Sequence, residues 1–177
     1  MTTCIDNEER LHLALRASFD GDHHTAILHL KELLKDEPEH AEALYLLAIQ
    51  HAELGLFDRA IAEMQRAVHL QPDLESARFQ LGLLLMERGR LVEAKQHFHA
   101  LRLSADRVLR TCADAMLSFA AQDLRSAKEK LASLLSPMPR QDASGSIAKL
   151  MYDVFSGEED FVNKADVSAE SDRLRAH

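Results

Sequence analysis

Glycine and proline are scarce in this 177-residue chain, which has only 6 and 4 of them against many Leu, Ala, Glu, Arg and Lys residues. Strong helix formers therefore dominate, which argues against a turn-rich β-sandwich or β-barrel and predicts an all-α fold. With 46% hydrophobic and 28% charged residues, the composition is that of a globular protein large enough to bury a core.

Cysteine is also rare. The two cysteines, Cys4 and Cys112, show neither a disulfide framework nor a spacing typical of a metal site. No apolar run approaches the roughly 18 residues that a membrane span needs. The first ten residues lack the basic start and the apolar run of a secretory signal. We therefore expect a soluble protein in a reducing, cytoplasmic compartment, without membrane insertion.

Basic residues are outnumbered, with 21 Lys and Arg against 29 Asp and Glu, so that the formal net charge is −8. Phosphate binding requires a concentrated basic surface, so no nucleic-acid partner is expected. The ten histidines include no pair four residues apart with a carboxylate partner, as a zinc signature would need. Neither a phosphate-binding glycine loop nor an activated nucleophile is found. The sequence therefore predicts no catalytic residue, no metal and no cofactor.

A period of 34 residues runs through the first part of the chain. The columns at this interval are Gly21/Gly55/Gly89, Ala14/Ala48/Gly82, Ala26/Ala60/Ala94, Leu13/Leu47/Leu81, Leu30/Met64/Phe98 and Pro38/Pro72. Within one period, apolar residues follow two helical faces with Gly55 between them. Small residues let paired helices approach closely, and glycine ends the first helix of each pair. The pattern predicts a stack of helix pairs.

A 34-residue helix–turn–helix unit with these small, glycine and proline columns resembles the tetratricopeptide repeat family. We expect an α-solenoid of three clear repeats, at residues 7–40, 41–74 and 75–108, and one distorted repeat at 109–141. The distortion is predicted as a turn one residue shorter near Gln122. A capping helix at 146–156 would complete a repeat domain spanning 1–156, and 157–177 would form a polar, flexible tail. One departure from the family is that Arg10, Leu44 and Arg78 replace the usual early aromatic residue.

The resemblance implies that repeat positions 2, 5, 9, 12 and 13 line a concave groove. Its predicted apolar residues are Leu11, Leu15, Phe19, Tyr45, Ile49, Phe79, Leu83, Met86 and Leu117. Its predicted rim consists of Glu8, Glu42, Glu53 and Glu87. Tyr45 and Phe79 would lie at the centre of the groove, and no residue there could pair with a peptide carboxylate by charge.

The resemblance therefore implies a protein-interaction adaptor or scaffold, or an assembly or secretion chaperone. It would bind an apolar peptide or an amphipathic helix with basic flanks. Three alternatives stay open. The apolar groove residues could pack internally, or they could be buried in a homodimer of a self-associating module. The helix at 146–156 could also fold back into the groove instead of capping the stack.

Overall fold

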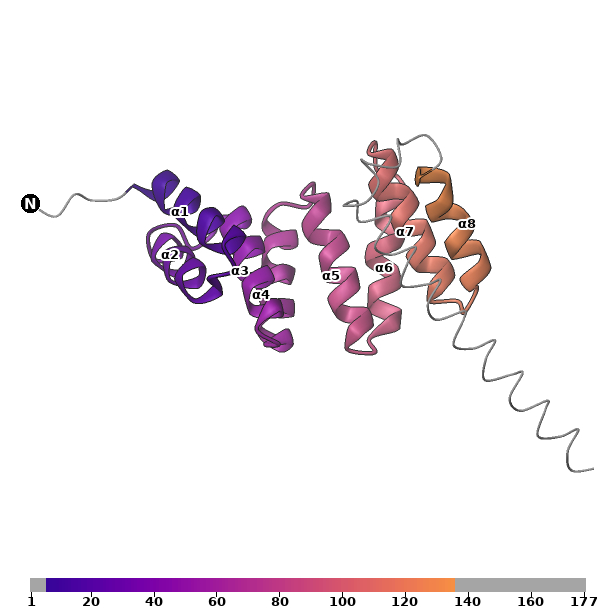
Figure 1. Ribbon diagram of the computed structural model, residues 1–177, viewed down its shortest axis with the longest axis horizontal. Coiled ribbons are helices and arrows are strands. Elements are labelled where there is room, and N and C mark those ends of the chain that lie inside the picture. Colours follow the sequence, from indigo (N-terminus) through magenta and orange to yellow (C-terminus); the bar gives the residue numbers. More distant parts are fainter. Residues whose placement is uncertain (1–5, 136–177) are drawn as a thin grey trace, which may run out of the picture. The chain divides into compact units, whose positions relative to one another are not determined.

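The computed structural model describes residues 6–135, and within that range the chain forms eight helices and no strand (Figure 1). The fold is all-α and is a helical solenoid of the predicted class. The helices are α1 (Asn7–Phe19), α2 (His23–Asp36), α3 (Ala41–Glu53), α4 (Phe57–Leu70), α5 (Glu75–Glu87), α6 (Leu91–Leu101), α7 (Arg107–Phe119) and α8 (Leu124–Leu135).

The chain divides into two compact units between His97 and Phe98. In the first unit each helix packs on the next one along the chain, from α1 on α2 through to α4 on α5. In the second unit α7 packs on α8. None of the helices described is long and apolar enough to cross a membrane.

The repeated columns form the core. Ala14, Ala48 and Gly82 are buried, and so are the larger residues of the column formed by Leu30 and Met64. The small side chains allow the two helices of a pair to approach closely, and the larger ones fill the space between neighbouring helices. The periodicity therefore identified the packing contacts as well as the helices.

The turn between the two helices of each repeat contains a residue with a left-handed backbone conformation. In the second repeat this residue is Gly55, whose φ of 73° costs glycine little. The N–H of the following residue, Leu56, donates to the His51 carbonyl at 2.8 Å and so satisfies a carbonyl at the end of α3. In the fourth repeat, Gln122 takes the place of the glycine with a φ of 64°.

The prediction of a shortened turn near Gln122 is wrong. Residues 120–123 separate α7 from α8, one residue more than in the other repeats. Two residues are lost earlier, because α6 has 11 residues whereas α2 and α4 each have 14, and the connection that follows α6 is only one residue longer than theirs. The longer turn at 120–123 restores one of the two. After the early end of α6, Asp106 caps α7 by accepting from the Val108 and Leu109 N–H groups.

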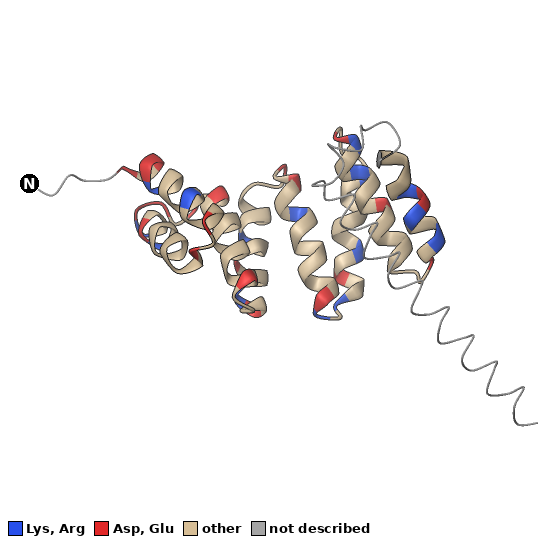
Figure 2. Ribbon diagram, in the orientation of Figure 1, with Lys and Arg blue, Asp and Glu red and all other residues tan. Residues whose placement is uncertain are grey.

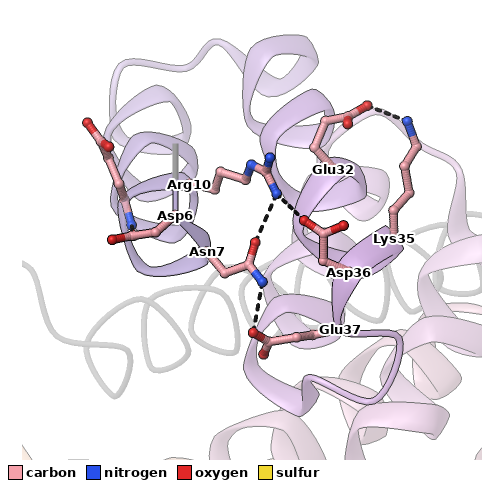
Figure 3. Close-up of polar contacts among 8 residues, drawn as sticks. Asp6, Asn7, Arg10, Glu32, Lys35, Asp36 and Glu37 are labelled. Carbon is pink, nitrogen blue, oxygen red and sulfur yellow. Dashed lines mark hydrogen bonds and ion pairs between the residues drawn. The ribbon is translucent and has the colours of Figure 1, made fainter. Parts of the chain in front are cut away.

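Polar contacts replace the aromatic packing expected early in the first helix (Figure 3). The Arg10 guanidinium donates to Asp36 at 2.5 Å and to Asn7 at 2.9 Å, which ties the start of α1 to the end of α2. Arg78, in the same column, donates to the Pro72 carbonyl at 2.8 Å. Both departures from the family pattern are therefore satisfied within the fold.

Some predicted segments lie outside the described residues. These are the end of the fourth repeat after residue 135, the capping helix at 146–156 and the polar tail at 157–177. The extent of the repeat domain, 1–156, therefore remains a prediction.

Candidate protein-binding face on the first helices

The first helices of the first three repeats are joined by direct contacts. α1 lies against α3, and Gln50 donates to the Ser18 hydroxyl at 2.8 Å. Between α3 and α5, the side chain of Ser76 lies close enough to the Tyr45 hydroxyl to lower its pKa. The groove positions therefore follow one another across three helices. We call the surface at these positions the first-helix face; it consists of Glu8, Leu11, Leu15, Ser18, Phe19, Glu42, Tyr45, Ile49, Ala52, Glu53, Ser76, Leu83, Met86 and Glu87.

A buried amide supports this face from behind. Gln50 is 1% exposed, and its side-chain oxygen is hydrogen-bonded to Nδ1 of His23 at 2.9 Å. Because an amide oxygen only accepts, His23 must carry a proton on Nδ1. Gln50 thus connects α3 to both helices of the first repeat. Gln50 is not among the predicted site residues, although a polar residue among the apolar residues of α3 is the signal that could have indicated it.

Most of the apolar residues of the face are half-buried, including Leu11, Tyr45, Ile49 and Leu83. Burial raises the pKa of the Tyr45 hydroxyl, while the interaction with Ser76 acts in the opposite direction. Tyr45 is therefore a neutral phenol that presents part of its ring and already uses its hydroxyl within the fold.

Phe79 does not belong to the accessible surface. Its side chain is only 3% exposed, so it is part of the core and cannot contact a ligand in this arrangement. The expectation that Phe79 lies at the centre of a groove must therefore be corrected. The period predicts the direction in which a side chain leaves its helix, but not how far its neighbours cover it.

The most exposed apolar surface of the face lies on α1. Phe19 is 93% exposed and Leu15 is 41% exposed, and with Leu11 they are spaced four residues apart on one side of the helix. We call these three residues the α1 stripe. In the next two repeats the position of Phe19 is taken by exposed Glu53 and Glu87. An exposed phenylalanine in a column of glutamates serves no packing purpose in the fold.

The opposite edge of α1 is polar. In α3, the residues that pack toward the preceding helix pair are Ala43, Leu46 and Gln50, all at least partly buried. The same columns in α1 hold Glu9, His12 and Arg16, all exposed. The exposed apolar surface of α1 is thus confined to the first-helix face.

Acidic residues occur on the first helix of each of the first three repeats. The four residues of the predicted rim, Glu8, Glu42, Glu53 and Glu87, are all exposed. Figure 2 shows acidic residues on the helices of the first unit. Over residues 6–97 the chain has 17 acidic and 10 basic residues, a formal charge of −7. The face therefore combines apolar side chains with a negative surrounding field.

Comparison with known families agrees with this architecture. The family model described as "Tetratricopeptide repeat" matches residues 11–75 and 52–107, which together cover more than half of the chain. The chain belongs to the tetratricopeptide repeat family. Proteins of this family bind other proteins through their repeats, and the repeats themselves are generally non-catalytic.

Two similar proteins are much longer than this chain and match it over only part of their length. DnaJ homolog subfamily C member 3 of Rattus norvegicus is 29% identical over 93 residues, which cover 52% of this chain and 18% of the rat protein. A mutant O-GlcNAc transferase of Thermobaculum terrenum has a TM-score of 0.62 at 28% identity, covering 74% of this chain and 26% of that one. The chain therefore spans about a quarter or less of these relatives.

Two solved structures cover more of the chain and show the fold. A tetratricopeptide repeat protein from Parabacteroides merdae has a TM-score of 0.69 at 18% identity, covering 95% of this chain and 65% of that one. MamA from Desulfovibrio magneticus has a TM-score of 0.61 at 18% identity, covering 92% and 96% of the two chains.

The second compact unit of this tetratricopeptide repeat protein contains the last predicted groove residue, Leu117, which is half-buried on α7. Cys112 is buried in the same helix, and burial raises the pKa of its thiol to about 11. A thiol with this pKa is almost entirely protonated near neutral pH. Cys112 therefore fits a packing role and lacks the thiolate character of a nucleophile.

Several histidines take part in the repeat packing. His51 is buried and its Nδ1 lies 2.6 Å from a Glu63 carboxylate oxygen, which joins α3 to α4. The His40 ring accepts from the Ala43 N–H and caps α3. Over residues 6–135, no three His, Cys, Asp or Glu side chains form a group that could hold a metal ion.

The basic turn between α5 and α6 is engaged with its surroundings. Arg88 lies over the ring of Phe57, 5.9 Å from its centre, beside a pocket of about 270 Å³ near the start of α4. Arg90 donates two hydrogen bonds to Glu93, each 2.7 Å long. Both arginines of this turn are therefore engaged in contacts within the fold.

Proposed function

We propose that this chain is a non-catalytic, cytoplasmic protein-interaction module that works as an adaptor or as an assembly or secretion chaperone. Its ligand is an apolar peptide or amphipathic helix of another protein, bound on the first-helix face. The observation that carries this proposal is the exposure of Phe19 and Leu15 on that face. Aromatic residues of this kind dominate the binding energy of many protein interfaces.

The charge around the α1 stripe indicates the chemistry of the ligand. Exposed Glu8, Glu42 and Glu53 favour a segment whose apolar residues are flanked by lysine or arginine. The chain's own apolar segment at 146–156 is followed by Glu158, Glu159 and other acidic residues, which this rim repels. A separate protein with basic flanks is therefore the better match.

The first-helix face is supported by contacts that the ligand does not have to create. Gln50 donates to Ser18, the residue before Phe19, and Tyr45 on α3 interacts with Ser76 on α5. A surface that is already ordered loses little conformational entropy when a ligand binds. Affinity can therefore come from a small number of apolar contacts.

The test uses a synthetic amphipathic peptide with leucines at i, i+3, i+4 and i+7 and lysines at both ends. Fluorescence anisotropy should show that the full chain binds this peptide more tightly than the same peptide with glutamates at its ends. Phe19→Glu introduces the residue that the next two repeats carry in this column, so the fold should accept it. It should weaken binding by about tenfold or more, which corresponds to roughly 1.4 kcal/mol.

The matched control is Leu28→Gln. Leu28 is an exposed apolar residue on α2, and the third repeat has Gln96 in its column. This variant should bind the lysine-flanked peptide with unchanged affinity. Equal binding by Phe19→Glu and the wild-type chain would refute a role for the α1 stripe.

A further inference from the structure

A second exposed apolar residue breaks the repeat pattern in the same way as Phe19. Leu103, between α6 and α7, is 92% exposed. In the 34-residue period its column holds Lys35 and His69 in the first two repeats, both exposed, although these lie within α2 and α4 whereas Leu103 follows the early end of α6. Phe19 and Leu103 are the two most exposed large apolar side chains among residues 6–134. Each stands in a solvent-facing column where the other repeats carry a charged or polar residue.

The two residues lie in parts of the chain with opposite charge. Residues 98–135 have six basic and four acidic residues, a formal charge of +2, whereas residues 6–97 carry −7. Leu103 is flanked by Arg102 and, four residues later, by exposed Arg107. Arg102 pairs with Asp114 at 2.8 Å, and Asp106 caps α7. Leu103 therefore lies in a segment, residues 102–108, whose two arginines and one aspartate give a formal charge of +1, and Arg107 is its basic residue outside the ion pair.

We propose that copies of this chain associate head to tail, with the Leu103 segment of one copy docked on the α1 stripe of the next. The segment, residues 102–108, has the chemistry that the acidic first-helix face favours, and it ends at the exposed apolar Val108. The contact rests on the same α1 stripe as the proposed function, but it also requires Leu103. Self-association therefore competes with ligand binding at that stripe.

Charge favours this heterologous contact over a symmetric one. A symmetric dimer through two α1 stripes would place the acidic surroundings of both copies against each other. The head-to-tail contact places the acidic first-helix face of one copy against the basic segment of another. In each dimer, one acidic face and one basic segment then remain free to bind further copies. Because the attraction involves exposed charges, association should weaken as the salt concentration rises.

The experiment follows sedimentation velocity of the full chain over a range of concentrations. The variants are Phe19→Glu and Leu103→Lys, each of which introduces the residue found in the same column of another repeat. The wild-type chain should sediment faster as its concentration rises. Each single variant should self-associate at least tenfold more weakly. An equimolar mixture should form a one-to-one complex, because Phe19→Glu retains the Leu103 segment and Leu103→Lys retains the stripe.

Leu28→Gln is again the control and should associate like the wild-type chain. A chain that remains monomeric at every concentration overturns the proposal, and so does a mixture of the two variants that remains monomeric. Loss of association in Phe19→Glu alone would indicate a symmetric contact and would also overturn it. Leu103→Lys should still bind the lysine-flanked peptide. A monomeric wild-type chain that binds this peptide would refute the head-to-tail contact while leaving the proposed function intact.

Discussion

The correction at Phe79 leads to a prediction that separates core residues from binding residues. Phe79→Ala removes the phenyl ring of a side chain that is 3% exposed in α5. Truncating a buried phenylalanine costs about 3–5 kcal/mol, through lost apolar burial and the cavity that remains. We therefore expect the free energy of unfolding of the full chain to fall by that amount.

Urea unfolding followed by circular dichroism at 222 nm measures this effect. For a slope of about 2 kcal/mol per molar urea, the midpoint should fall by about 2 M. The control is Phe19→Ala, which truncates a phenylalanine that is 93% exposed instead of buried. It should change the free energy of unfolding by less than about 0.5 kcal/mol. A stable Phe79→Ala variant that binds the lysine-flanked peptide more weakly would refute the assignment of Phe79 to the core.

Two further predictions concern the turns and the buried thiol. Gly55→Ala should destabilise the chain by about 1 kcal/mol in calorimetry, because φ is 73° at this position, although no atom lies within 4 Å of the added Cβ. Gln122→Gly should stabilise the chain by about 0.5–1 kcal/mol, because Gln122 has a φ of 64°. Equal melting temperatures of the wild-type chain and both variants would contradict this prediction. In a Cys4→Ser background, the Cys112 thiol should react slowly with iodoacetamide near pH 7. The rate should rise as the pH approaches the pKa of about 11, where the thiolate forms. Rapid labelling of the folded chain at pH 7 would show that the thiol is accessible and activated.

The helical architecture could be predicted from the sequence because the same pattern of apolar and small residues occurs three times, so that an atypical residue in one repeat is outweighed by the other two. α1, α3 and α5 begin at Asn7, Ala41 and Glu75, the first residues of the three predicted repeats. Three independent copies of each buried column support one alignment, so a single atypical residue does not disturb it. The fourth repeat had no such support, and α7 begins at Arg107 instead of at 109.

The candidate site was less predictable, because exposure depends on neighbours that a period does not describe. Phe79 and Tyr45 occupy the same repeat position, yet the first is buried and the second is half-buried. Gln50 became interpretable only when His23 and Ser18 were seen on either side of it. Likewise, Gln122 showed no glycine-like pattern in the sequence, although it adopts the glycine conformation in the turn.

Departures from the repeat columns fall into two physical classes. Arg10 and Arg78 depart in a packing column, and hydrogen bonds within the fold compensate for the change. Phe19 and Leu103 depart in solvent-facing columns, where an apolar side chain gains nothing from packing and exposes hydrocarbon to water. The fold accounts for the first class. The second class costs solubility and brings no packing in return, so it is best explained by a contact outside the folded chain. Exposed residues that depart from the repeat pattern without compensation are therefore the positions at which we propose to test for binding.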